Sequence, residues 1–282
     1  MIVSGSESQA LAAALATSLD EPLAAVQYDR FPDGEVLAAV PGFERGERAV
    51  VVAATTTSDA HLELLQLQVA AREGGANEVV TVIPYMGYGR QDDAFEAGHP
   101  ISARAVARAV STGTDRVVLV TPHEPAVADF FEVPCETVEA APRLAEPLPT
   151  GLDDPLFVAP DAGATDLAET VRDAYGDGDV DHFEKTRLSG TDVEITTGSA
   201  SVRGRDVVVV DDIVATGSTM SEAIAAVDGD ADDVYVVCVH PLFVRDARTK
   251  LARAGVSGIW GTDTVERDVS AVSVAPLVAD VL

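Results

Sequence analysis

Four consecutive valines at 207–210 are the feature of this sequence that most restricts what the chain can fold into. Valine is β-branched, and an unbroken run of it predicts a strand that is buried on both faces, as in parallel sheets. Two carboxylates, Asp211 and Asp212, end the run. A short loop of small and hydroxyl residues comes next, and residues 221–227 have the composition of a helix. The pattern therefore predicts a strand, a loop and a helix in succession, which is a unit of α/β proteins.

The loop between this strand and this helix has the composition of a phosphate site, because unpaired N–H groups and the positive end of the helix dipole point outward there. Glycine lets the backbone approach an anion closely, and hydroxyl groups donate without a counter-charge. The two carboxylates can accept hydrogen bonds from sugar hydroxyls or hold a cation. For any single residue an ordinary helix cap is the alternative, but the whole set predicts a pocket for a phosphorylated sugar. The set is Asp211, Asp212, Ala215, Thr216, Gly217, Ser218 and Thr219.

The charge balance narrows the classes of partner that the chain can bind. It has 19 Lys and Arg against 47 Asp and Glu, for a formal net charge of −28. Nucleic-acid and anionic-membrane surfaces need clustered Lys and Arg, so we expect neither kind of partner. The acidic surface, with Lys185 and Lys250 as its only lysines, resembles that of cytoplasmic proteins from high-salt environments.

Hydropathy and cysteine content predict a cytoplasmic protein. No apolar run is long enough to span a bilayer, and the Ala/Leu-rich N-terminal stretch has no basic flank, so it predicts an amphipathic helix and not a signal peptide. Two cysteines are too few for a disulfide framework or a cysteine-based metal site, and Cys238 lies in an apolar run where we expect it to be packed.

The rest of the chain alternates strand and helix patterns, as expected for two α/β domains that each contain a mostly parallel sheet flanked by helices. An internal repeat supports this, because residues 50–53 align with 207–210 and Pro84 aligns with Pro241 at the same offset. We expect strands at 1–4, 49–54, 78–83, 116–120, 156–159 and 234–239, a hairpin of 180–184 with 193–196, and helices at 7–18, 59–73, 102–112 and 165–175. Ser102 is predicted to cap the helix at 102–112.

The two predicted halves differ in chemistry. The first copy of the repeat has Ala54 and Thr55 in place of the two carboxylates, so sugar binding is predicted in the second half. A Pro-rich passage at 140–155 is interpreted as the linker between the halves. The predicted domains are therefore residues 1–141 and 142–282.

Other candidate functional residues stand in predicted loops. Arg90 and Gln91 offer hydrogen-bonding edges for a phosphate or a base. His123 lies just past the carboxyl end of a strand, where ligands bind, although a lone histidine is usually structural. Lys185 and Arg187 stand in the predicted hairpin loop and are candidates for a charge clamp over phosphates, with a solvated surface lysine as the alternative.

In this order, the segments resemble the ribose-phosphate diphosphokinase family over nearly the whole chain, and the acidic composition resembles its haloarchaeal members. The sugar-phosphate segment alone also resembles phosphoribosyltransferases, but a single-domain phosphoribosyltransferase would lack the other motifs. The resemblance is carried by residues 30–35, 90–92 and 98–104, by His123, by Lys185 and Arg187, and by residues 211–219.

The resemblance implies two tandem phosphoribosyltransferase-like domains and a role for each motif. The turn at 30–35 would reach the site of a neighbouring subunit, so the chain would form at least a homodimer. The implied ATP-binding residues are Phe31, Asp33, Glu35, Arg90 and Gln91. The implied catalytic residues are Lys185, Arg187 and His123, the implied ligands of Mg²⁺ are His123 and Asp161, and residues 211–219 would hold ribose 5-phosphate.

The implied reaction transfers the diphosphoryl group of MgATP to the 1-hydroxyl of ribose 5-phosphate and releases AMP. Two departures from the family pattern stand out. Many members have an acidic magnesium ligand where this chain has Thr121, so Glu124 or water would have to replace it, and residues 165–167 stand where relatives often carry basic residues. The alternatives are a phosphoribosyltransferase and a non-catalytic regulatory paralogue, and the presence of Lys185, Arg187 and His123 favours the enzyme.

Overall fold

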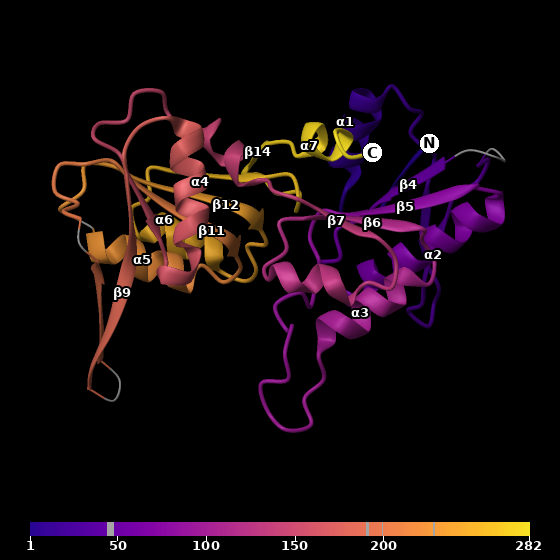
Figure 1. The fold of residues 1–282 in the computed structure, drawn as a ribbon, viewed down its shortest axis with the longest axis horizontal. Helices are drawn as coiled ribbons and strands as arrows, with labels where there is room; N and C mark the ends of the chain where they lie inside the picture. Colours follow the sequence, from indigo (N-terminus) through magenta and orange to yellow (C-terminus); the bar gives the residue numbers. More distant parts are fainter. Residues whose placement is uncertain (44–47, 190–191, 199, 228) are drawn as a thin grey trace. The chain divides into compact units, whose positions relative to one another are not determined.

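The computed structural model describes residues 1–43, 48–189, 192–198, 200–227 and 229–282, with the backbone alone described for 185–189 and 192–197. The described chain packs as two units, which can be followed by colour in Figure 1. The first unit consists of Met1–Glu139, Asp263–Glu266 and Ser273–Leu282, and the second of Ala140–Thr262 and Arg267–Val272. The predicted domain bounds, 1–141 and 142–282, stay a prediction.

The first unit is built on a five-stranded parallel sheet with the strand order β1-β4-β5-β6-β7. Its strands are β1 (Ile2–Ser4), β4 (Arg48–Val52), β5 (Glu78–Ile83), β6 (Arg116–Val120) and β7 (Cys135–Val138), and a separate hairpin pairs β2 (Gln27–Arg30) with β3 (Val36–Ala39). Its helices are α1 (Gln9–Leu19), α2 (Ser58–Gly74), α3 (Ser102–Ser111), η1 (Pro125–Phe130) and α7 (Ala275–Ala279). Figure 1 shows α1 and α7 on one side of this sheet and α2 and α3 on the other, which explains why the central strands β4, β5 and β6 are mostly apolar and buried.

The second unit contains a seven-stranded sheet with the order β10-β9-β8-β11-β12-β13-β14, parallel except for the β9–β10 hairpin. Its strands are β8 (Leu156–Ala159), β9 (Asp179–Ser189), β10 (Asp192–Thr197), β11 (Val207–Val214), β12 (Val234–Pro241), β13 (Gly258–Thr262) and β14 (Ser270–Val272). Its helices are η2 (Ala141–Ala145), η3 (Ala162–Ala164), α4 (Thr165–Tyr175), α5 (Ser218–Val227) and α6 (Ala247–Arg253). The predicted α/β class, with two domains of mostly parallel strands flanked by helices, is confirmed.

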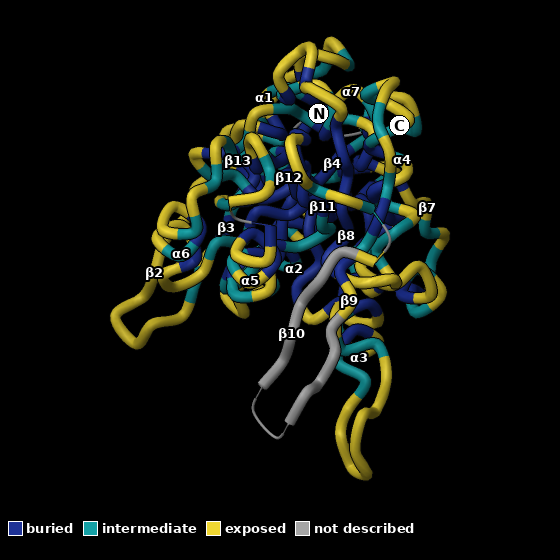
Figure 2. The backbone as a smooth tube through the Cα atoms, turned by 90° about the vertical axis from the view of Figure 1, so that its left-hand side faces the viewer, coloured by how far each residue is buried: buried dark blue, intermediate teal, exposed yellow. Residues whose placement is uncertain are grey.

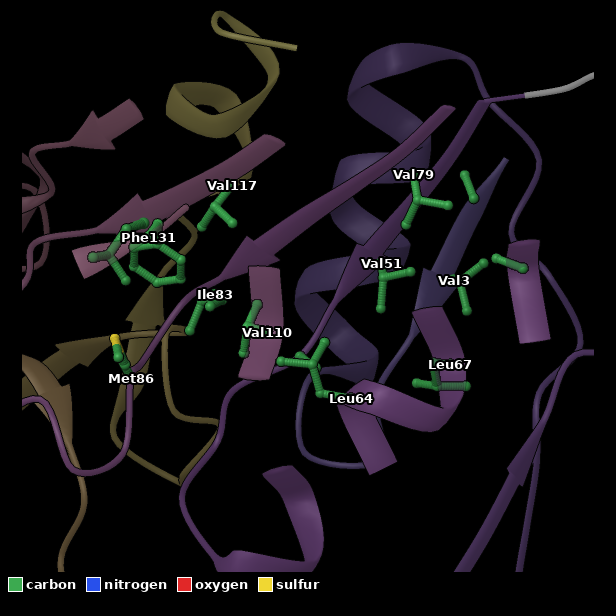
Figure 3. Packing of buried hydrophobic residues seen from close by; sticks show 14 of the residues in the cluster. Val3, Val51, Leu64, Leu67, Val79, Ile83, Met86, Val110, Val117 and Phe131 are labelled. Carbon is green, nitrogen blue, oxygen red and sulfur yellow. The ribbon is translucent and has the colours of Figure 1, made fainter. Parts of the chain in front are cut away.

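Each unit has its own hydrophobic core between sheet and helices. In the first unit, Val51 and Ile83 of the strands share one cluster with Leu64 and Leu67 of α2, as Figure 3 shows. The buried residues of α2 recur at helical spacing, so one stripe of the helix faces the sheet. Full burial of one such side chain stabilises the fold by roughly 1.5–3 kcal/mol. In Figure 2 the strands β4, β8, β11 and β12 are accordingly coloured mostly as buried.

The passage at 140–155, interpreted from its prolines as the linker between the halves, belongs to the second unit. Ala140, Ala141 and Leu144 are fully buried, and Leu148 is nearly so. Pro142 stands in the first turn of η2, where its fixed φ favours a helical start and its missing N–H costs little. The segment therefore packs into the second unit, and proline content alone was a poor guide to it.

The internal repeat is present as a shared order of strands, but its register differs between the units. Val50 of β4 pairs with Val80, whereas Val207 of β11 pairs with Val234, so the partner lies three residues nearer along the chain in the second unit. The constant offset in the sequence therefore cannot superpose both strands at once. Separately, no helix within the described ranges has the length and hydropathy that crossing a membrane requires.

Candidate functional site

The strand that carries the two carboxylates is longer than predicted. β11 includes Asp211 and Asp212 and runs on to Val214, because its backbone stays paired with β12, where Asp211 lies opposite Cys238. The four valines before them are fully buried, whereas both carboxylates are half-buried. An apolar run marks the buried part of a strand, but backbone pairing decides where the strand ends. Cys238 is fully buried, as predicted.

The carboxylates at this edge of the sheet repel one another. Burial, followed by the charges of Asp212 and Asp161, raises the pKa of the Asp211 carboxyl to about 8. The N–H of Asp212 donates to Oδ1 of Asp211 at 2.9 Å, which opposes that rise in pKa. Asp161 follows β8, the strand beside β11, so the three carboxylates come from neighbouring strand ends. Such an edge favours a cation or hydroxyl donors and disfavours an uncompensated anion.

The donors at this edge suit Mg²⁺ in their chemistry. Carboxylate oxygens are its preferred protein ligands, and Mg²⁺ is usually held by one or two of them together with water and substrate phosphates. Among the described residues, no group of three His, Cys, Asp or Glu side chains is arranged to hold a metal ion. The carboxylates present at this edge would therefore suit an ion that also takes water and phosphate oxygens as ligands.

Residues 215–219 form the predicted loop, and helix α5 begins within it at Ser218. The N–H of Ser221 donates to the Gly217 carbonyl at 2.9 Å, which closes the first turn. Gly217 has a φ of +70°, and a Cβ there would lie 3.2 Å from the carbonyl oxygen of Ala247, so any other residue would be strained and crowded. The loop therefore presents the start of a helix, while phosphate binding by it stays a prediction.

One side chain at this loop escaped the sequence analysis. Lys250, on α6, donates from Nζ to Oγ of Ser218 at 3.1 Å and to the carbonyl oxygen of Thr216 at 3.5 Å. The contact depends on the packing of α6 beside α5, so no local pattern marks it. Its rarity, as one of two lysines, was the available signal.

In the first unit, the predicted nucleotide loop follows β5 and is anchored by Thr55. The internal repeat aligns Thr55 in sequence with Asp212 of the second unit. The N–H of Thr55 donates to the carbonyl oxygen of Tyr85 at 2.9 Å, and its hydroxyl accepts from the N–H of Gly87 at 2.9 Å. Arg90 is exposed and Gln91 is half-buried. The equivalent position thus supports a loop in the first unit, while in the second unit its role as a ligand contact stays a prediction.

Gln91 is positioned by the start of α3, where the predicted helix cap was wrong. Ile101 precedes the helix, and the Ser102 hydroxyl donates to Oε1 of Gln91 at 2.5 Å instead of capping. The N–H of Ala103 also donates to the backbone carbonyl of Gln91, at 3.1 Å. Side chain and backbone of Gln91 are therefore both oriented by this helix.

We expect Gly87→Ala to weaken ATP binding by moving this loop. A Cβ at Gly87 would lie 2.0 Å from the carbonyl oxygen of Thr55 and 2.9 Å from Nε2 of His61, so the backbone must shift. Overpacking of this kind destabilises by roughly 1–3 kcal/mol. Calorimetry should show a lower unfolding midpoint, and steady-state kinetics a raised KM for ATP with the KM for the sugar substrate unchanged. An unaltered midpoint and KM for ATP would contradict this role of Gly87.

The turn at 30–35 is the exposed tip of the β2–β3 hairpin, which Figure 2 draws in the exposed colour. Its Arg30 guanidinium pairs with the Asp59 carboxylate at the start of α2. The hydroxyls of Tyr88 and Ser58, also at the start of α2, lie 3.1 Å apart. Both predicted ATP-binding segments of the first unit therefore reach the same helix end, while Phe31, Asp33 and Glu35 stay exposed.

His123 is exposed and follows β6, as its predicted role requires. Thr121, which replaces the family's acidic residue, is buried with a φ of +36°, and its hydroxyl donates to Oε1 of Glu139 at 3.1 Å. Glu124, the substitute considered from the sequence, is exposed on the same loop. Glu139 is a carboxylate that sequence reasoning missed, because only the β6–β7 pairing brings it to Thr121.

Lys185 and Arg187 lie in strand β9 and not in the predicted hairpin loop. The hairpin itself is confirmed, with longer arms than expected, and Lys185 lies opposite Ile195 while Arg187 lies opposite Val193. Both side chains lie outside the described part of the chain. The predicted charge clamp therefore stays a prediction.

Comparison with known proteins covers both halves. Residues 1–113 match the family model of the N-terminal domain of ribose phosphate pyrophosphokinase, and residues 154–253 match that of the phosphoribosyl transferase domain. The chain is 62% identical to the ribose-phosphate pyrophosphokinase of Halobacterium salinarum over 100% of both proteins. It is 43% identical to that of Methanosarcina mazei, over 100% of this chain and 94% of the relative.

A solved structure agrees with these matches. The phosphoribosylpyrophosphate synthetase from Mycobacterium smegmatis has a TM-score of 0.86 to this chain at 27% identity, covering 100% of this chain and 96% of that one. The family resemblance and the tandem fold that the motifs indicated are thereby confirmed. From its two domain matches and its full-length relatives, the chain belongs to the ribose-phosphate pyrophosphokinase family.

Proposed function

We propose that this chain transfers the diphosphoryl group of MgATP to the 1-hydroxyl of D-ribose 5-phosphate, giving 5-phospho-α-D-ribose 1-diphosphate and AMP for nucleotide biosynthesis. The observation that carries the proposal is the edge of the second unit, where the carboxylates of β11 lead into a helix start at residues 215–219. Full-length relatives named for this activity support it.

The sugar substrate would be bound by the second unit. Asp211 and Asp212 would accept hydrogen bonds from the ribose hydroxyls, and the loop with the first turn of α5 would donate to the 5-phosphate. The half-buried position of the carboxylates supports this role, because charge-assisted hydrogen bonds are strong where water is partly excluded. The loop contacts would be Ala215, Thr216, Gly217, Ser218 and Thr219.

The nucleotide would be bound by the first unit. Arg90 would contact the phosphates, and Gln91, oriented by α3, would present its amide to the base or the phosphates. Phe31, Asp33 and Glu35 would reach the nucleotide of a second copy, so that the chain works as at least a homodimer. The exposure of that whole turn supports the second part, since a segment that serves a neighbour must be accessible.

The chemistry requires charge to be neutralised as the bond to AMP breaks. Lys185 and Arg187 would donate to the phosphate oxygens on which charge accumulates, and the attacking and leaving oxygens must be held in line. Mg²⁺, when bound, would neutralise phosphate charge. We propose His123 as a ligand of Mg²⁺ in the first unit and, separately, Asp161 as a ligand of Mg²⁺ in the second. The carboxylates around Asp211 support a requirement for a divalent cation.

The test is a coupled assay for AMP with purified protein, MgATP and ribose 5-phosphate, at high and at low salt. AMP that forms only when the sugar is present supports diphosphoryl transfer. ADP in place of AMP would mean simple kinase chemistry. Turnover of phosphoribosyl diphosphate with a free base would mean a phosphoribosyltransferase, and no turnover at any salt concentration would leave the regulatory paralogue.

A further inference from the structure

The sugar-phosphate loop lies in strongly acidic surroundings. Asp161, Asp211 and Asp212 come from the strand ends beside it. The whole chain carries a formal charge of −28. Repulsion from these carboxylates disfavours the binding of a phosphate dianion here unless a positive charge lies close to it. Helix N–H groups supply partial charges, and a full positive charge would complete the site.

Lys250 brings such a charge to the loop. Its Nζ lies 3.1 Å from Oγ of Ser218, the first residue of α5, and 3.5 Å from the carbonyl oxygen of Thr216. These two residues flank Gly217, so the ammonium group reaches both sides of the turn. The Lys250 side chain is 35% exposed, so its ammonium group keeps access to a ligand arriving from solvent.

The position of Lys250 is fixed by packing. The next residue, Leu251, is fully buried in the core cluster of the second unit, and Ala247, one turn earlier, is also fully buried. Because Gly217 has no side chain, the loop rests directly against Ala247. The stem of Lys250 therefore starts from an anchored helix that touches the loop, which limits how far the ammonium group can stray.

The third partner of Lys250, the Asp246 carboxylate, is one that a ligand can displace. Nζ lies 3.3 Å from Oδ1 of Asp246, and the hydrogen bond from Lys250 holds the pKa of that carboxyl below its usual range. Asp246 is exposed, and exposed ion pairs of this spacing are weak because water solvates both charges. A phosphate dianion at the helix start offers a stronger partner than this carboxylate.

We propose that Lys250 is the cation that recognises the phosphate of the sugar substrate: it orients the Ser218 hydroxyl in the free protein and turns from Asp246 to the 5-phosphate on binding. The inference rests on the proposed function and adds a residue to its sugar site. Lysine suits the role because its ammonium group is a compact point charge with three donors, able to hold Ser218 and a phosphate oxygen together.

The test compares Lys250→Met with Arg253→Met. Both variants remove one positive charge from α6, but Arg253 is exposed in the last turn of the helix. Isothermal titration should show ribose 5-phosphate binding at least about tenfold weaker in Lys250→Met, as expected for loss of a charge-assisted hydrogen bond, and near wild-type in Arg253→Met. The KM for ribose 5-phosphate should rise in parallel, with the KM for ATP and kcat little changed.

Two further measurements separate the possible outcomes. Lys250→Arg keeps the charge and should restore affinity to within about threefold, while Asp246→Asn should bind the sugar as tightly as wild type or more tightly. Equal affinity in wild type and Lys250→Met, with both proteins folded by circular dichroism, would overturn the inference and leave the proposed function intact. A wild-type protein that neither binds ribose 5-phosphate nor forms AMP would overturn both.

Discussion

Replacing Lys185 with alanine should lower kcat by a factor on the order of 10² or more, the usual loss when one preorganised donor to a developing charge is removed. The KM values for ATP and ribose 5-phosphate should change little, because the donor is needed most when charge accumulates on the transferring group. The measurement is the initial rate of AMP formation at saturating substrates. Arg187→Ala should lower kcat in the same direction.

Arg203→Ala is the matched control for this experiment. It removes a cation from the same unit, but the Arg203 side chain is 83% exposed and pairs with the surface carboxylate of Asp230. Its kcat should equal that of wild type. A near-normal kcat in Lys185→Ala would remove the proposed role of this residue and favour the solvated surface lysine that the sequence left open.

Replacing Asp211 with asparagine should make the free protein more stable and should raise the KM of the enzyme for ribose 5-phosphate. The pKa of Asp211 is raised in the folded state to about 8 from an ordinary value of 3.8, so the folded protein holds a proton that the unfolded chain releases. By linkage, wild-type stability falls as pH rises from about 4 to about 8. Asparagine carries no charge and keeps the oxygen that accepts from the N–H of Asp212. The stability of the variant therefore should not fall in this way as pH rises.

The measurement is the unfolding midpoint of both proteins without substrate or metal, at pH 5 and at pH 8. The gap in favour of Asp211→Asn should be larger at pH 8. Measured above pH 8, where the wild-type carboxyl is ionised, its KM for ribose 5-phosphate should rise about 10- to 100-fold, as expected when a hydrogen-bond acceptor loses its charge. Asp232→Asn is the control, because that exposed carboxylate precedes β12 and so lies at the opposite edge of the sheet from Asp211. A midpoint gap independent of pH would contradict the assigned cause.

Most elements could be read from local pattern, because burial on one or both faces imposes a period that the sequence must follow. The buried valines of β11, the mostly apolar β5 and the amphipathic α4 lie where hydropathy predicted them. The ends of helices and strands were predicted less accurately. β11 continues through Asp211 because backbone pairing with β12 does not depend on hydropathy, and Ser102 bonds Gln91 instead of capping α3.

The strand, loop and helix start around residues 207–227 were likewise evident from one stretch of chain, and the family from several short motifs that are each contiguous in sequence. Tertiary structure decided what comes from elsewhere: Lys250 reaches Ser218 from another helix, Glu139 reaches Thr121 from the next strand, and residues 140–155 pack instead of linking. These contacts join positions distant in sequence, where neither period nor spacing carries information. Local composition governs which elements form, and the packing of one element on another governs which side chains meet at a site.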